Sequence, residues 1–90
     1  MGRVRIPPVL RDTVGGAREV DASGTTVSAI LADLFRARPE LGARLTTEDG
    51  RLSTFVNVYV NGSDIRLLDG SDTPVGADDV VILLPAMAGG

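Results

Sequence analysis

The residues of this chain that could take part in chemistry lie at its end, Ala86-Met87-Ala88-Gly89-Gly90, directly after an apolar run closed by Pro85. Glycine has no Cβ, so the Gly89-Gly90 pair can pass through a channel too narrow for other residues. Gly90 carries the terminal carboxylate, a group whose ordinary pKa is about 3.3–3.7. An extended, unhindered carboxylate can serve as the substrate of another enzyme. We therefore predict that Gly90 is the reactive site; the alternative is a frayed end without a role.

The amino acids that are missing restrict what else the chain can do. The sequence contains no cysteine, histidine or lysine, and all nine of its cationic residues are arginine. Disulfides, thiolate or imidazole metal ligands, cysteine or serine–histidine nucleophiles and lysine Schiff bases are therefore excluded. The carboxylates Glu48 and Asp49 are a weak candidate for a metal site, because no third ligand is near them in the sequence. We therefore expect that the protein has no catalytic residues and no cofactor of its own.

Length and charge limit the domain count and the partners. Ninety residues with 43% hydrophobic content fit one domain with a packed core. The formal net charge of −3 disfavours nucleic acid or an anionic membrane as the main partner. No apolar run reaches the roughly 20 residues of a membrane span, and the N-terminus lacks the apolar stretch of a signal peptide. We expect a cytoplasmic protein.

The first half of the chain predicts a hairpin followed by a helix. Residues 3–6 and 18–21 read as two strands, joined by a wide loop that contains Gly15-Gly16. Thr25 or Thr26 can cap the helix that follows. An apolar stripe then recurs at helical spacing, and Pro39 ends the helix near Arg38. The stripe is Val27, Ile30, Leu31, Leu34 and Phe35.

The second half predicts more strands around turns. Residues 41–52 are weakly patterned, and we expect an irregular excursion there that includes one short helical turn. Residues 55–60 predict a strand whose side chains alternate between two faces, with Phe55, Asn57 and Tyr59 on one of them. The turn pair Asn61-Gly62 follows this strand. Residues 63–67 form a short strand or turn, and residues 80–84 are apolar on both faces, as in a central strand. The expected fold class is α+β: a β-grasp domain over residues 1–85, with a mixed four- to five-stranded sheet and one main helix, followed by a flexible tail over residues 86–90.

One helix can cover only one face of such a sheet. Because the last strand is apolar on both faces, some of its side chains should face outward beside Phe55 and Tyr59. An exposed apolar patch of this kind usually marks a partner surface. The alternative is that the excursion over residues 41–52 folds over the patch.

Three stretches of the sequence carry a resemblance to a known family. They are Phe-Val-Asn-Val-Tyr-Val-Asn-Gly at 55–62, Val-Ile-Leu-Leu-Pro-Ala-Met-Ala-Gly-Gly at 81–90, and Arg11-Asp12 with Gly15-Gly16. With these, the chain resembles over its whole length the ubiquitin-like bacterial sulfur carriers of the ThiS, MoaD and CysO family. The first two stretches are most similar to the CysO type. Pro7-Pro8 departs from the MoaD pattern, and residues 41–52 are longer than in ThiS proteins.

The resemblance implies a chemistry and a set of partners. A ubiquitin-activating-like enzyme would adenylate Gly90, and sulfur would displace AMP to leave a thiocarboxylate. A pyridoxal-phosphate-dependent cysteine synthase would use this sulfur, and a JAMM-type metalloprotease would release the product; pyridoxal phosphate and zinc belong to those enzymes. The outward residues that dock on the activating enzyme would be Val80, Ile82 and Leu84, with Val81 and Leu83 in the core.

Four other functions stay open at this point. A MoaD-type subunit would pass sulfur to a pterin precursor, and another kind of carrier would serve a sulfur-containing secondary metabolite. A ubiquitin-like modifier would be joined through Gly90 to lysines of other proteins. A plain β-grasp binding module would carry its two final glycines without using them.

Overall fold

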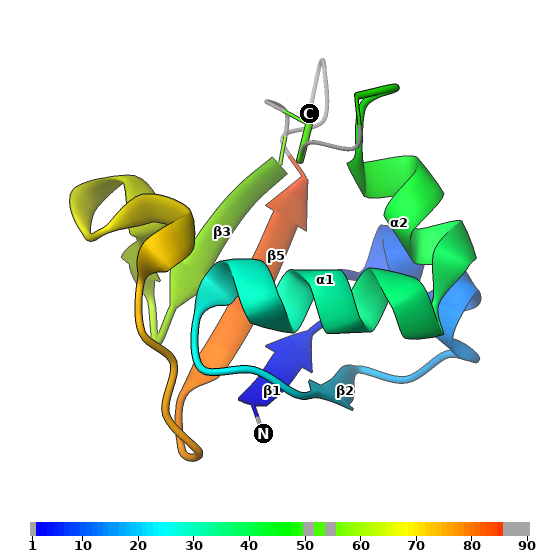
Figure 1. Ribbon diagram of the computed structural model, residues 1–90. Coiled ribbons are helices and arrows are strands. Elements are labelled where there is room, and N and C mark those ends of the chain that lie inside the picture. The colour runs from blue at the N-terminus through cyan, green and yellow to red at the C-terminus, as the bar shows by residue number, and fades with distance from the viewer. Residues whose placement is uncertain (1, 50–51, 54–55, 86–90) are drawn as a thin grey trace.

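The computed structural model describes residues 2–49, 52–53 and 56–85, which form one five-stranded mixed sheet covered by helices on one side (Figure 1). The strand order is β2-β1-β5-β3-β4. The central pair, β1 and β5, is parallel, and the other three pairs are antiparallel. This confirms the predicted β-grasp arrangement. The strands are β1 (Gly2–Arg5), β2 (Glu19–Ala22), β3 (Val56–Val60), β4 (Ser63–Asp64) and β5 (Val80–Pro85).

Helix α1 (Val27–Ala37) crosses the sheet and packs on it through the predicted apolar stripe. Its N-cap is Thr26, whose Oγ1 accepts a hydrogen bond from the Ala29 amide at 3.2 Å and so satisfies one of the free donors of the first turn. Val27, Ile30, Leu31 and Leu34 are buried, and Phe35 is half-buried. The helix stops at Ala37 because Pro39 disfavours helical geometry at the preceding residue.

The segment expected to hold an irregular excursion with one short helical turn contains a second helix, α2 (Pro39–Leu45). This helix is seven residues long, so the regular structure begins earlier and extends further than expected. Proline at the first position of the helix loses no hydrogen bond, because the first N–H groups have no partner inside the helix. Leu41 and Leu45, four residues apart, are 0% and 2% exposed. A Cβ on Gly42 would lie 3.0 Å from Cβ of Phe35, so glycine lets α2 approach α1 closely.

Two hairpins join strands that are neighbours in the sheet, β1 to β2 and β3 to β4. The loop of the β1–β2 hairpin holds a 3-10 helix, Pro8–Val14, whose Leu10 and Val14 enter the core. Asn61 and Gly62 make the turn from β3 to β4 with φ angles of 53° and 92°, the left-handed geometry that tight hairpin turns require. Two further 3-10 helices, Ile65–Leu67 and Gly70–Asp72, follow β4.

The core lies between the sheet and the helices and is almost wholly aliphatic. Its most deeply buried side chains come from every layer: Val4, Ile6, Val27, Ile30, Leu34, Leu41, Leu45, Val81 and Leu83. No helix in the described part of the chain is both long and apolar enough to cross a membrane.

We expect Val58→Ala to lower the free energy of unfolding by about 1–3 kcal/mol, because it removes methyl groups from a side chain that is 2% exposed. The matched control is Val9→Ala, the same chemical change at a side chain that is 53% exposed. Urea unfolding followed by circular dichroism measures both. Equal losses at the two positions would contradict the core assignment.

Candidate functional site

The face of the sheet away from the helices carries the side chains that the sequence placed outward on the last strand. Along β5, Val81 and Leu83 are fully buried, while Leu84 is 45% exposed and Val80 and Ile82 are half-buried. The expected inward and outward alternation of β5 is therefore confirmed. Because successive side chains of a strand point to opposite faces, Val80, Ile82 and Leu84 lie on one surface.

The neighbouring strand β3 adds residues to this surface directly opposite those of β5. Tyr59 of β3 lies opposite Ile82, and Asn57 lies opposite Leu84. We call Tyr59, Val80, Ile82 and Leu84 the outer strip. Phe55, which the sequence also assigned to it, lies outside the described residues. Asn57 lies on the same face as Tyr59, because the two are two residues apart on one strand. The sequence analysis placed it on that face but did not single it out as a site residue.

Charged residues border the outer strip on both sides. On β1, Arg3 lies beside Val80 and Arg5 beside Ile82. Arg5 forms an exposed ion pair with Glu19 of β2 at 3.4 Å. At the other edge, Asp64 accepts hydrogen bonds from the guanidinium and the backbone N–H of Arg66, and these lower the pKa of its carboxyl. The surface is thus apolar in the middle and polar at both edges, as partner-binding surfaces commonly are.

Helix α2, which belongs to the segment that could have folded over the apolar patch, does not cover the outer strip. Helix α2 contacts α1 and the 3-10 helix Pro8–Val14, so it belongs to the helical layer on the opposite side of the sheet. The alternative that residues 41–52 fold over the patch is therefore wrong for the helical part of that segment.

A hydrogen-bonded corner fixes the start of β5. The Asp79 carboxylate accepts from the Gly76 amide and from Nδ2 of Asn61, each at 2.8 Å, and Oδ1 of Asn61 accepts from the Val80 amide at 2.9 Å. The Gly76 N–H, and after it the Asn61 side chain, lower the pKa of Asp79 below its ordinary value of 3.8. Sequence reasoning assigned Asn61 to a turn and missed this second role.

The tail assigned to chemistry, residues 86–90, lies outside the described residues. Strand β5 runs as far as Pro85, so the outer strip leads directly to the residue before the tail. The described residues contain no group of three or more histidine, cysteine, aspartate or glutamate side chains that could hold a metal ion. Among them, Glu48 and Asp49 are exposed.

Comparison with known proteins places the chain in a family. Residues 4–90 match the ThiS family. The chain belongs to the ThiS family. It is 42% identical over 89 residues to the sulfur carrier protein CysO of Mycobacterium tuberculosis, a match that covers 97% of this chain and 96% of the relative.

Solved structures of similar proteins show the same fold. The structure of the Amycolatopsis orientalis BexX/CysO complex contains a chain with a TM-score of 0.86 and 40% identity, and each chain is covered completely. The small archaeal modifier protein 1 of Methanosarcina acetivorans has a TM-score of 0.87 at 28% identity, covering 98% of this chain and 94% of the other. The resemblance to CysO-type members of the ThiS family, predicted from the sequence, is thereby confirmed.

We expect the corner at Asp79 to make stability depend on pH in the acid range. Because the folded pKa is lowered, the contribution of this carboxylate is fully present above about pH 4 and is lost as the pH falls through the folded pKa. Asp79→Asn keeps the shape and an acceptor but does not titrate. The free energy of unfolding, measured with urea at a series of pH values from 5 to 2.5, should therefore fall less steeply for the variant than for the parent.

Asp33 and Asp64 also have lowered pKa values, so the parent and the variant should both lose stability in acid, and the difference between them isolates Asp79. Asp78→Asn, at the exposed neighbouring position, is the control and should follow the parent curve. Identical curves for Asp79→Asn and the parent would show that this carboxylate does not anchor β5.

Proposed function

We propose that this protein is a sulfur carrier whose Gly90 carboxylate is converted to a thiocarboxylate for cysteine synthesis. The observation that carries the proposal is the 42% identity over 89 residues to CysO sulfur carriers, in a chain whose last strand leads into Ala-Met-Ala-Gly-Gly. The relatives are themselves small carrier proteins, and this chain contains none of the histidine, cysteine or lysine side chains on which independent nucleophilic catalysis usually depends.

The chemistry needs an activating enzyme, because a carboxylate is a poor electrophile. The Gly90 carboxylate attacks the α-phosphorus of ATP, and pyrophosphate leaves with the bonding electrons. Hydrosulfide then attacks the carbonyl carbon of the acyl-adenylate and loses its proton, and AMP leaves as the C–O bond breaks. The product is a thiocarboxylate, and the sequence of steps involves no net oxidation or reduction.

The tail provides reach and access. Five extended residues after Pro85 span at most about 16–18 Å, enough for Gly90 to enter a deep site while the folded domain stays outside. The absence of side chains on Gly89 and Gly90 leaves the attacked carbon open to both the nucleotide and the sulfur nucleophile. Ala86, Met87 and Ala88 are small or unbranched and fit the same narrow path.

The outer strip is the surface we assign to docking on the adenylating enzyme. Its support is the exposure of Leu84, the half-burial of Tyr59, Val80 and Ile82, and its position on the strand that leads into the tail. Phe55 is assigned to the same surface from the sequence. The client in this proposal is a pyridoxal-phosphate-dependent cysteine synthase, and a JAMM-type metalloprotease releases the new amino acid from the carrier.

A second candidate, a protein modifier, is favoured by the similarity to small archaeal modifier protein 1. In that role the activated Gly90 would be attacked by a lysine amine of another protein. This chain has no lysine, so it cannot be extended into chains through lysine side chains. Each acceptor lysine would therefore carry a single copy, and conjugates in a cell extract would increase in steps of one chain per lysine used.

We expect the intact mass of the protein to rise by the difference between sulfur and oxygen after incubation with ATP, sodium sulfide and an adenylating enzyme of the ThiS-family systems. Deletion of Gly90 should abolish the gain, because the next carboxylate would be one residue too short to reach the reacting groups. Absence of a gain with several such enzymes would overturn the carrier proposal. Lysine-linked conjugates without thiocarboxylate would instead favour the modifier.

We expect Ile82→Asp to weaken docking on the adenylating enzyme by about tenfold or more, because it places a charge in the middle of the outer strip. Leu67→Asp is the matched control, since Leu67 is 83% exposed and lies on the 3-10 helix after β4, outside the outer strip. Isothermal titration calorimetry measures the affinity, and circular dichroism checks the fold. Equal affinities for the two folded variants would rule out the outer strip as the docking surface.

A further inference from the structure

The outer face of the sheet contains a hollow next to the outer strip, which we call the arginine hollow. It has a volume of about 580 Å³ and is lined by Arg5, Arg11, Arg18 and Glu19. Arg5 and Glu19 are register partners on β1 and β2, and Arg5 lies beside Ile82 of the outer strip. Because cross-strand partners point to the same face of a sheet, the hollow opens on the side of the outer strip.

The backbone around the arginine hollow holds Arg11 in place. Nε of Arg11 donates a hydrogen bond to the Ile6 carbonyl at 3.1 Å, and the Ile6 amide donates to the Arg18 carbonyl at 2.8 Å. The Gly16 amide donates to the Arg11 carbonyl at 2.7 Å, and Gly15 and Gly16 have φ angles of 68° and 84°, which favour glycine. The motif of an arginine followed by two glycines, which the sulfur chemistry does not use, therefore positions one side chain of the hollow.

The arginine hollow is positive although the chain as a whole is acidic. It is lined by three arginines and one glutamate, whereas the formal net charge of the chain is −3. Glu19 pairs with Arg5 at 3.4 Å. Arg11 and Arg18 form no ion pair within the part of the chain that the structure describes. Because a guanidinium group binds carboxylates through two parallel hydrogen bonds, two unpaired arginines in one hollow favour an anionic ligand.

The two borders of the outer strip differ in charge. On the β1 side, Arg3 and Arg5 border the strip, and Arg5 also lines the arginine hollow. On the β4 side, Arg66 is bound to Asp64 at 2.7 Å, and the two charges cancel. A protein that docks on the outer strip therefore meets a larger positive charge at the β1 border than at the β4 border.

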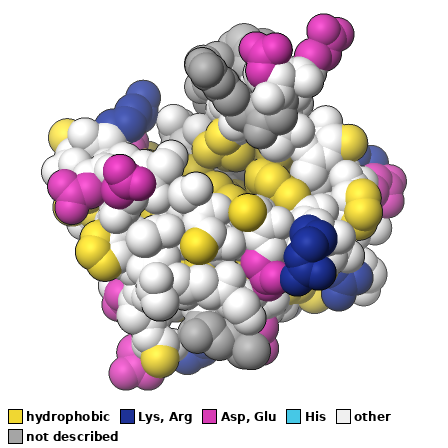
Figure 2. All heavy atoms as spheres, in the orientation of Figure 1, with side chains coloured by type: hydrophobic (Ala, Val, Ile, Leu, Met, Phe, Trp, Pro, Cys, Tyr) yellow, Lys and Arg dark blue, Asp and Glu magenta, His cyan; other side chains and the backbone are white. Residues whose placement is uncertain are grey.

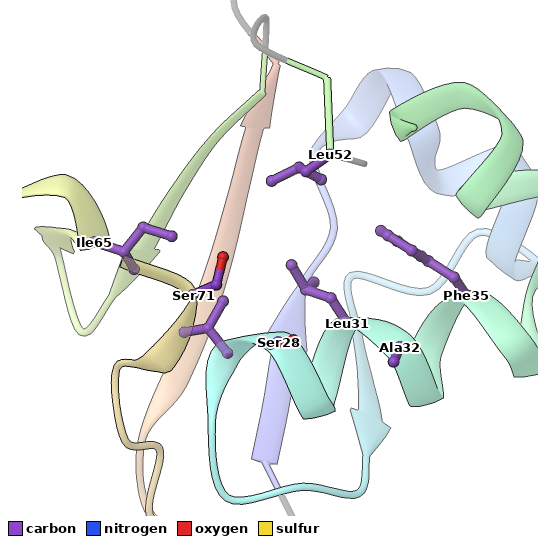
Figure 3. Close-up of a pocket in the computed structure, with 8 residues that line it drawn as sticks. Ser28, Leu31, Ala32, Phe35, Leu52, Ile65 and Ser71 are labelled. Atoms are coloured by element: carbon purple, nitrogen blue, oxygen red, sulfur yellow. The ribbon is translucent and has the colours of Figure 1, made fainter. Parts of the chain in front are cut away.

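The hollow on the helical side of the molecule is of a different kind. It has a volume of about 450 Å³ and is lined mainly by apolar residues, among them Leu31, Phe35 and Leu52 (Figure 3). None of the described residues that line it is charged, and Figure 2 shows acidic side chains on two sides of it. Because like charges repel, an acidic segment is directed away from this side and toward the arginine hollow.

We propose that the arginine hollow binds aspartate or glutamate side chains of the protein that docks on the outer strip. The proposal rests on the docking role given to the outer strip above, and it adds the chemistry of the partner. That partner has an apolar contact surface with carboxylates at one border only. Its carboxylates bind Arg11 and Arg18 and compete with Glu19 for Arg5.

Charge at one border also determines the orientation of the docked protein. A partner turned by half a turn on the outer strip would place its carboxylates beside the Asp64–Arg66 pair, where they gain no net attraction. Since the tail follows β5 at Pro85, the orientation of the sheet on the partner sets the direction in which the tail leaves the interface. The arginine hollow thus selects the docked orientation that points Gly90 at one place on the partner.

The first experiment uses the full 90-residue chain with nitrogen-15 in its arginines and a synthetic peptide, acetyl-Glu-Asp-Leu-Asp-Glu-amide. Titration followed by NMR should shift the Nε–Hε signals of Arg11 and Arg18. The signal of Arg38, an exposed arginine between α1 and α2, should stay unchanged. A peptide with glutamine and asparagine in place of the four acids should cause no shift, and added salt should weaken binding of the acidic peptide.

Three results of this titration would overturn the proposal. The first is the absence of any shift at millimolar peptide. The second is an equal shift of Arg38, which would show attraction to any exposed arginine. The third is a shift of the same signals by inorganic phosphate at a lower concentration than the peptide requires, which would identify a site for a small anion.

Two variants change the charge of the arginine hollow in opposite directions. Arg18→Gln should weaken peptide binding about two- to fivefold, because one unpaired guanidinium group is lost. Glu19→Gln should strengthen it about twofold, because Arg5 is released from its ion pair. The matched controls are Arg38→Gln and Asp78→Asn, which make the same charge changes at exposed positions outside the hollow. Equal effects of the variants and their controls would show that net charge alone attracts the peptide.

The same variants, checked for folding by circular dichroism, are then titrated against the adenylating enzyme. Arg18→Gln should weaken docking more than Arg38→Gln does. If the enzyme forms the thiocarboxylate and Ile82→Asp weakens docking, but Arg18→Gln and Arg38→Gln bind equally, the arginine hollow is not used and only the present proposal fails. If no adenylating enzyme forms the thiocarboxylate, the sulfur-carrier proposal fails, and the peptide titration still decides whether the hollow binds carboxylates.

Discussion

The parallel pairing of β1 with β5 at the centre of the sheet is the constraint on which the rest of the structure depends. It places Val4 beside Val81, and both side chains are fully buried under α1. A parallel pair cannot be joined by a tight turn, so the chain between them must cross the sheet, and it does so as α1 and the elements after it. In the described part of the chain, α1 and α2 therefore lie on one side of the sheet, and the opposite side of β5 is left to face solvent or a partner.

Local sequence patterns predicted the elements for which the residues favour a single backbone geometry. The apolar stripe of α1, its threonine cap and the Asn61-Gly62 turn each have one favoured geometry, and the structure contains all three. Helix α2 was predicted only as one short turn because Pro39 has two opposite effects: it ends the helix before it and starts the next one. The spacing of Leu41 and Leu45 was the available signal, and Gly42 between them, which lowers helix propensity, obscured it.

The candidate site could be predicted only in part, for a physical reason that lies in β5 itself. A strand with apolar residues on both faces has no alternation, so its sequence does not say which of Val80 or Val81 faces the core. The resemblance to sulfur carriers supplied that assignment, and the burial of Val81 and Leu83 confirms it. The corner formed by Asn61 and Asp79 joins residues that are 18 positions apart, and no local pattern marks such a contact.

The direction of β1 and β5 also determines how the molecule responds to mechanical load. Because the two strands are parallel, β1 begins at Gly2 at one end of the sheet and β5 ends at Pro85 at the other. A force that draws the end of β5 away while the start of β1 is held acts along both strands. The hydrogen bonds between them are then sheared together and cannot open one after another. A protein pulled by its tail in this way resists unfolding along the line of the pull.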